Sequence, residues 1–213
     1  MDETSERAFT NGSADLENVS QTRWQLMRRG IGVATFLGGG ALLARHLEPA
    51  EATPSAAGDA EIFNFALLLE YLQAAFYTDA VSRGKLHGEL RDFAEVVASH
   101  ERDHVQFLRD TLGSKARQKP DFEFGDATRD EQKFARTALL LENIGVAAYN
   151  GQAANLTKRG LSAAVEIVSV EGRHAAWISD LTGKDPAPRA ADPGQSATQV
   201  AAALRATGFL KSS

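Results

Sequence analysis

The feature that most restricts the fold of this chain is an internal repeat. The segment Ala-Leu-Leu-Leu-Glu occurs twice and ends at Glu70 and at Glu142. In each copy a tyrosine, Tyr77 or Tyr149, follows seven residues after that glutamate. A Glu-x-x-His motif then follows in each copy, about 30 residues after the same glutamate. The chain therefore contains two units of one design, and we expect them to fold alike.

From residue 59 onward the apolar residues recur with a helical period, and no stretch alternates as a half-buried strand would. The pattern predicts four long helices, at about 60–82, 89–112, 128–155 and 162–182. Asp59 is the expected N-cap of the first helix, and Thr128 with Glu131 forms the expected capping box of the third. A second capping box, Ser196 with Gln199, predicts a short last helix after a Pro-bearing stretch.

The connection between the second and third helices predicts the topology. Residues 113–127 contain Pro120 and span about 50 Å when extended, whereas a helix of this length measures about 36 Å. The connection can therefore cross the bundle lengthwise and leave the two helices parallel. We expect an all-α fold, a four-helix bundle of two hairpins with this crossover. The expected organisation is a leader at 1–52, the bundle at 53–182 and a tail with the short helix at 183–213.

The candidate chemistry lies in carboxylates and imidazoles on apolar helix faces. Glu70 and Glu142 are isolated charges within apolar segments, which is costly unless a partner is present. The Glu-x-x-His motifs supply partners, because residues i and i+3 share one helix face. The spacing brings six residues to one level of the core: Glu70, Glu101, His104, Glu142, Glu171 and His174. The alternative is two buried Glu–His ion pairs without metal, in which four clustered carboxylates would repel one another.

The segments NFALLLEYLQAAFY, ENIGVAAYNG and VEGRHAAW carry a resemblance to a known family. Residues 60–182 resemble the ferritin-like domain family, especially its exported bacterial group related to desiccation-associated proteins. The resemblance implies a di-iron or di-manganese centre with all six residues as ligands, in which Glu101 and Glu171 bridge the two ions. Gln73 stands where related sequences often have another glutamate, so no extra carboxylate for a mobile or third metal is implied there.

Further residues lie near the expected ligands. Tyr77 and Tyr149 share the face of Glu70 and Glu142, two turns on, where each is either a hydrogen-bond partner of a ligand or a core residue. Asp103 and Arg173 adjoin the two histidines and form either a pair with each other or part of the solvated surface. His100 is one residue off the ligand face, and we expect it at the surface.

Composition narrows the function. The absence of cysteine excludes disulfides, thiolate metal sites and a cysteine nucleophile. A net charge of −5 argues against nucleic acid as a partner. Carboxylates with imidazoles suit two Fe or two Mn ions, which activate dioxygen or peroxide, so we expect Fe(II) or peroxide oxidation in stress protection. The main alternative is a structural stress protein that metal only stabilises. The apolar first helix favours it, as either a deeply buried helix or a subunit interface in a homo-oligomer. A substrate oxygenase or desaturase and a storage cage also remain open.

The first 52 residues resemble an export signal. Residues 1–22 are polar and lack any period, so we expect them to be disordered. Arg28 and Arg29 precede an apolar, Gly-rich run at 30–44, and the small-x-small pattern that ends at Ala52 follows. This order resembles a twin-arginine signal and implies export by that machinery to the periplasm or beyond. The alternatives are an N-terminal membrane anchor that is retained and a disordered cytoplasmic tail.

Overall fold

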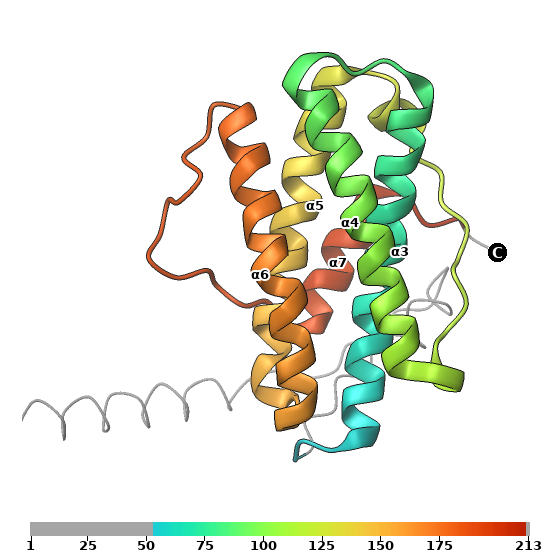
Figure 1. Ribbon diagram of the computed structural model, residues 1–213, viewed down its shortest axis with the longest axis vertical. Helices are drawn as coiled ribbons and strands as arrows, with labels where there is room; N and C mark the ends of the chain where they lie inside the picture. The colour runs from blue at the N-terminus through green and yellow to red at the C-terminus, as the bar shows by residue number, and fades with distance from the viewer. Residues whose placement is uncertain (1–52, 212–213) are drawn as a thin grey trace, which may run out of the picture. The chain divides into compact units, whose positions relative to one another are not determined.

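The computed structural model describes residues 53–211, and the predicted export signal at 1–52 lies outside that range. The four long helices are α3 (Ala56–Arg83), α4 (Gly88–Leu112), α5 (Glu131–Gln152) and α6 (Lys158–Leu181). A short helix, α7 (Ala197–Thr207), follows them (Figure 1). The described residues thus confirm the predicted all-α bundle with a short helix after it.

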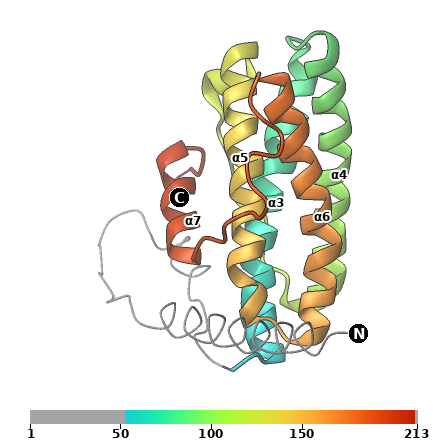
Figure 2. The ribbon, with the colours of Figure 1, turned by 90° about the vertical axis from the view of Figure 1, so that its left-hand side faces the viewer.

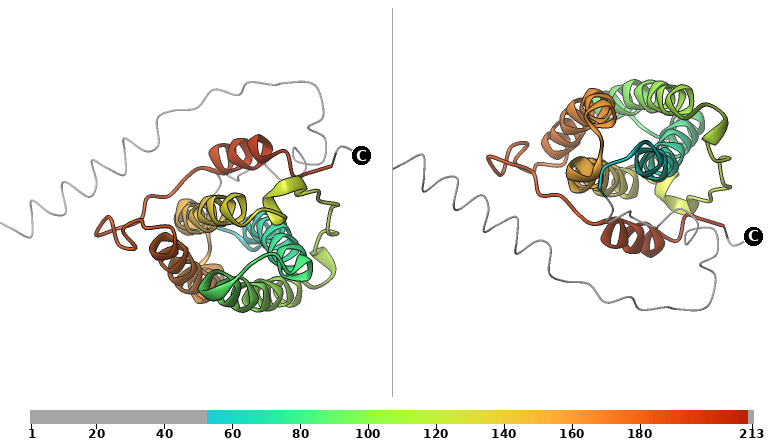
Figure 3. Two further views of the ribbon diagram at one scale, coloured as in Figure 1. Left: turned by 90° about the horizontal axis from the view of Figure 1, so that it is seen from above. Right: turned by 90° about the horizontal axis from the view of Figure 1, so that it is seen from below.

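The two hairpins, α3–α4 and α5–α6, lie side by side. Viewed along the bundle, the helices follow one another around the core in the order α3, α4, α6, α5 (Figure 3). The chain between α4 and α5 runs the length of the bundle, and α4 and α5 point in the same direction (Figure 1). The predicted crossover is therefore present, and it makes α4 and α5 diagonal neighbours.

Two predicted helix starts are wrong, because other side chains reach the free amides. Ser55, not Asp59, caps α3 by accepting a hydrogen bond of 3.1 Å from the amide of Gly58. Asp130, not Thr128, caps α5, because its carboxylate accepts from the amide of Lys133 at 2.8 Å. Thr128 is buried in a 3-10 turn, and its hydroxyl donates to Asp79.

The boundary between α5 and α6 also differs from the prediction. Helix α5 ends at Gln152 and continues into a 3-10 turn, Ala153–Asn155. Helix α6 begins at Lys158, about a turn earlier than expected, because Thr157 caps it through the amide of Gly160. The capping box between Ser196 and Gln199 at the start of α7 is confirmed.

The crossover is fastened to α3 by buried polar side chains. The side-chain nitrogen Nδ2 of Asn64 donates to the backbone carbonyl of Lys115. The side-chain oxygen Oδ1 of Asn64 accepts from the backbone amide of Arg117 at 2.8 Å. The Tyr71 hydroxyl donates to the Arg117 carbonyl. At its far end the crossover pairs with the chain after α7, through a bridge between Phe122 and Leu210.

The apolar core runs through the bundle and beneath α7. The Phe76 and Phe134 rings stack with centroids 5.2 Å apart, and Val200 and Leu204 of α7 are buried in the same cluster. Figure 2 shows α7 lying outside α5, where it covers that face of the bundle. In the stretch from residue 53 to residue 211, no helix combines the length and hydropathy that a bilayer span requires.

Candidate metal centre

All six predicted ligand residues come together in the middle of the bundle. Glu70 comes from α3, Glu142 from α5, and the two Glu-x-x-His motifs from α4 and α6. The four carboxylates are at most 1 % exposed, and His174 and His104 are 3 % and 8 % exposed. Each hairpin thus contributes one isolated glutamate and one Glu-x-x-His motif. In both hairpins these side chains are buried in the interior of the bundle.

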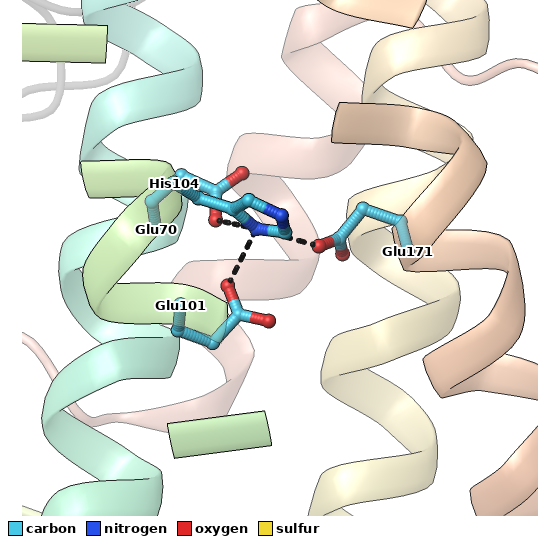
Figure 4. Close-up of side chains that lie close together, drawn as sticks. All are labelled: Glu70, Glu101, His104 and Glu171. Carbon is cyan, nitrogen blue, oxygen red and sulfur yellow. Dashed lines mark hydrogen bonds and ion pairs between the residues drawn. The ribbon is translucent and has the colours of Figure 1, made fainter. Parts of the chain in front are cut away.

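One half of the centre is built around His104. Its Nδ1 lies 3.3 Å from Glu70 Oε2, 3.4 Å from Glu101 Oε2 and 3.3 Å from Glu171 Oε1. Figure 4 shows this arrangement, with three carboxylates from three helices directed at one imidazole nitrogen. The four donor atoms fall within 4.8 Å of one another, which is compact enough to surround one cation.

The other half of the centre is built around His174. Its Nδ1 lies 3.1 Å from Glu101 Oε1, 3.2 Å from Glu142 Oε2 and 3.8 Å from Glu171 Oε1. These residues form a second group that could hold a cation. Glu101 and Glu171 belong to both groups, whereas Glu70 and Glu142 each belong to one. Glu101 directs one oxygen toward each histidine, as a bridging carboxylate would.

The polar atoms at the centre lack partners that would satisfy them. Among the described residues, no hydrogen bond reaches five buried carboxylate oxygens or His174 Nδ1. The five oxygens are Glu70 Oε2, Glu101 Oε1, Glu142 Oε2, Glu171 Oε1 and Glu171 Oε2. Buried acceptors are seldom left unpaired, because each loses its bonds to water. Oxygen and imidazole ligands around a shared space fit hard divalent ions such as Fe(II) and Mn(II).

The electrostatics of the cluster reflect concentrated negative charge. Burial and the neighbouring carboxylates raise the pKa of Glu101 and that of Glu171 well above 4.5. Burial also opposes ionisation of Glu70, but the neighbouring His104 and Glu101 and the hydrogen bond from Tyr149 lower its pKa overall. Desolvation opposes the charge on His104, yet the surrounding glutamates raise its pKa strongly. The site therefore favours positive charge at its middle, either as protons or as a cation.

Two tyrosines connect the hairpins at this level. The hydroxyl of Tyr149 on α5 donates to Glu70 Oε1 on α3 at 2.7 Å, and the hydroxyl of Tyr77 on α3 donates to Glu142 Oε1 on α5. Burial and the nearby carboxylates raise the pKa of both tyrosines, which keeps the hydroxyls protonated as donors. Both tyrosines are thus hydrogen-bond partners of a candidate ligand, which is the first of the two roles that the sequence left open. Gln73 donates to the same Glu142 oxygen at 3.0 Å.

Gly145 was not singled out by the sequence, although it lies one turn after Glu142. A Cβ atom at this position would overlap with Glu171 Oε2 and approach the side-chain nitrogen of Gln73. Only glycine leaves room for the shared carboxylate. The repeat does point to this position. Gly145 aligns with Gln73, so one copy has a large side chain where the other has none.

The outer edge of the centre opens between α4 and α6. A cavity of about 420 Å³ is lined there by both histidines of the centre, together with His100 and Trp177. His100 is exposed as predicted, but its Nδ1 lies 2.9 Å from His174 Nε2, a contact that the prediction missed. Asp103 and Arg173 line the same cavity.

A four-helix bundle with a crossover and an inward set of two glutamates and two Glu-x-x-His motifs defines the class of ferritin-like carboxylate proteins. The family model for the ferritin-like domain matches residues 58–184 of this chain. The chain belongs to the ferritin-like domain family. A search of curated proteins gives no match. The expectation of a ferritin-like fold is therefore confirmed, while the roles of the six residues as ligands stay a prediction.

Proposed function

We propose that the protein is a dimetal carboxylate protein that binds two Fe or two Mn ions and oxidises Fe(II) or consumes peroxide in stress protection. One observation carries the proposal: two groups of buried ligands overlap in Glu101 and Glu171. A shared pair of carboxylates serves two adjacent cations better than one. On this proposal Glu70 and His104 complete one metal position, and Glu142 and His174 complete the other.

When bound, two such ions would supply electron-transfer chemistry with dioxygen or peroxide. The protein contributes position and a dry surrounding. Tyr77 and Tyr149 fix the outer oxygens of Glu142 and Glu70, so that the remaining oxygens stay directed at the centre. The four carboxylates are at most 1 % exposed, so the fold itself keeps water away from them. The cavity between α4 and α6 brings small molecules to the outer edges of the two histidines.

The proposal is tested by metal analysis of the full chain, purified without added metal. We expect about two Fe or Mn per chain. The double variant Glu101→Ala/His104→Ala is expected to lose them. The control is Glu131→Ala/His87→Ala, which removes an exposed Glu–His pair 3.6 Å apart at the end of the bundle. A folded wild-type chain that takes up neither Fe nor Mn contradicts the proposal.

Turnover is tested separately, by the rates of Fe(II) oxidation and of peroxide decay with the metal-loaded chain. Rates above those of the Glu101→Ala/His104→Ala variant support oxidation chemistry. Metal that binds without turnover supports the alternative, a structural stress protein that metal stabilises. That alternative rests on the apolar first helix, as either a deeply buried helix or a subunit interface. In the structure, apolar residues of α3 such as Leu67, Leu68 and Phe76 are already buried within the chain.

Export is a further part of the proposal. It is supported by Arg28 and Arg29 before the apolar run at 30–44. Cell fractionation of the wild type and of Arg28→Lys/Arg29→Lys tests it. We expect the wild type in the periplasm or the medium and the variant in the cytoplasm. Equal distribution of both contradicts twin-arginine export, and wild type in the membrane fraction favours the retained anchor.

A further inference from the structure

The two halves of the centre differ outside the six ligand positions. His100 on α4 meets His174 on α6, with 2.9 Å between His100 Nδ1 and His174 Nε2. The two rings stack with centroids 5.2 Å apart. In the repeat, Ser99-His100-Glu101 aligns with Ser169-Val170-Glu171, so the counterpart of His100 is Val170. Valine has no polar side-chain atom to offer to His104.

The hydrogen bond acts on the nitrogen of His174 that faces away from the centre. Nδ1 of His174 faces Glu101 and Glu142, where a metal would bind. A neutral imidazole carries one proton, so binding at Nδ1 leaves that proton on Nε2. His100 Nδ1 lies where it accepts this proton in a hydrogen bond. Such a partner fixes the tautomer and the ring orientation of a ligand histidine and makes it a better ligand.

We propose that His100 is a positioning residue for His174, and that it makes the two metal positions unequal in affinity. The position completed by Glu142 and His174 binds its ion more tightly than the position completed by Glu70 and His104. The inference rests on the proposed dimetal centre and adds that the position completed by Glu142 and His174 takes up its ion first. Val170 and His104 line the same cavity as His100 and His174. Among residues 53–211, His174 has a side-chain partner at its outer nitrogen and His104 has none there.

The inference is tested by titrating the metal-free full chain with Mn(II) alone, following the signal of free Mn(II) in electron paramagnetic resonance. We expect the wild type to bind Mn(II) in two separate steps. His100→Phe keeps a ring against His174 but removes the acceptor. It is expected to weaken the tighter step by about 10- to 100-fold and to leave the other step unchanged. His100→Gln, which offers an amide oxygen, is expected to restore part of the loss.

Two further variants separate positioning from a general effect. In a His174→Ala background, His100→Phe is expected to have no additional effect, because the residue acts through His174. Val170→His gives His104 a potential partner and is expected to narrow the difference between the two steps. His87→Phe is the control, because its side chain is exposed in a loop.

The outcomes that overturn the inference are distinct. A single-step wild-type titration overturns the unequal positions. Two-step binding that His100→Phe leaves unchanged, or weakens equally in both steps, overturns the role of His100 alone. A wild-type chain that binds no Mn(II) and no Fe(II) overturns the dimetal proposal itself, and this inference with it.

Discussion

The hydroxyl of Tyr149 on α5 donates a hydrogen bond of 2.7 Å to Glu70 Oε1 on α3, across the boundary between the two hairpins. The equivalent tyrosine of the other repeat copy makes the reciprocal bond: Tyr77 on α3 donates to Glu142 on α5. Each tyrosine therefore holds the glutamate of the other hairpin and not the one seven residues before it. The two bonds join the hairpins at the level of the centre.

Tyr149→Phe is expected to weaken Mn(II) binding by about 10-fold or more, because Glu70 loses the partner that orients it. The metal-free protein should also lose about 1–3 kcal/mol of stability, because a buried carboxylate oxygen is left without a donor. Mn(II) titration and urea unfolding measure the two effects. Tyr71→Phe is the control: its hydroxyl bonds Arg109 and the Arg117 carbonyl, so it should cost stability without changing metal affinity.

Gly145→Ala is expected to abolish or strongly weaken metal binding, because the added Cβ atom would overlap with Glu171 Oε2. Glu171 belongs to both groups of candidate ligands, so moving its carboxylate should disturb both proposed metal positions. The strain should also destabilise the metal-free bundle by about 1–3 kcal/mol. Metal analysis and thermal unfolding of the purified variant check both effects.

Gly172→Ala on α6 is the matched control for this substitution. Apart from its chain neighbours and the nearby backbone of its own helix, no described atom lies within 4 Å of a Cβ built at Gly172. Alanine should therefore stabilise the helix by about 0.5–1 kcal/mol and leave the metal content unchanged. If Gly145→Ala binds metal as tightly as Gly172→Ala does, the close approach of Glu171 has no functional role.

The sequence was sufficient to predict the parts of the site that follow from helical periodicity. Glu101 and His104 had to share a face, and an isolated Glu70 in an apolar helix had to point inward. The length of the connection allowed the crossover but did not by itself require it. These features depend on the repeat and on local geometry, both of which can be read along one segment at a time.

Contacts between helices could not be derived in this way. His100 lies off the ligand face of α4, which predicts a surface position, but α6 packs against α4 so that His174 Nε2 lies 2.9 Å from His100 Nδ1. Asp59 has the residue type and position of an N-cap, yet its carboxylate serves the start of another helix. Gly145 could be recognised only once the position of Glu171 was known. Each depends on the relative placement of two helices, which periodicity does not determine.

The effect of pH should distinguish the metal-free from the metal-bound protein. Burial and repulsion raise the pKa values of Glu101 and Glu171 above 4.5. A group whose pKa is raised on folding contributes its full stabilisation when the pH is below its pKa in the unfolded state. It loses this contribution as the pH rises toward its pKa in the folded state. The pKa of His104 is also raised, so His104 likewise loses its stabilising contribution as the pH rises above the ordinary histidine value of 6.5. Between about pH 5 and pH 8 the metal-free protein should therefore become less stable.

Metal binding has the opposite dependence, because it requires deprotonated ligands and strengthens as pH rises. The difference in melting temperature between Mn(II)-loaded and chelator-treated protein should widen from about pH 5 to pH 8. Glu101→Gln removes one of the titrating carboxyls and should reduce the slope for the metal-free protein. A difference that is constant over this range contradicts the role of these carboxyls as ligands.

Asp59 joins the first turn of α3 to the start of α6. Its carboxylate accepts from the amide of Thr157 at 2.9 Å and from the Thr157 hydroxyl, where the free amides of α6 favour negative charge. Asp59→Ala should therefore destabilise the fold by about 1–2 kcal/mol, as loss of a cap does. Thermal unfolding measures this, with Asp92→Ala, exposed on α4, as a control expected to change stability by less than about 0.5 kcal/mol. The centre lies several turns away, so metal content should be the same in both variants, and a loss confined to Asp59→Ala would mean that this end of the bundle also positions the ligands.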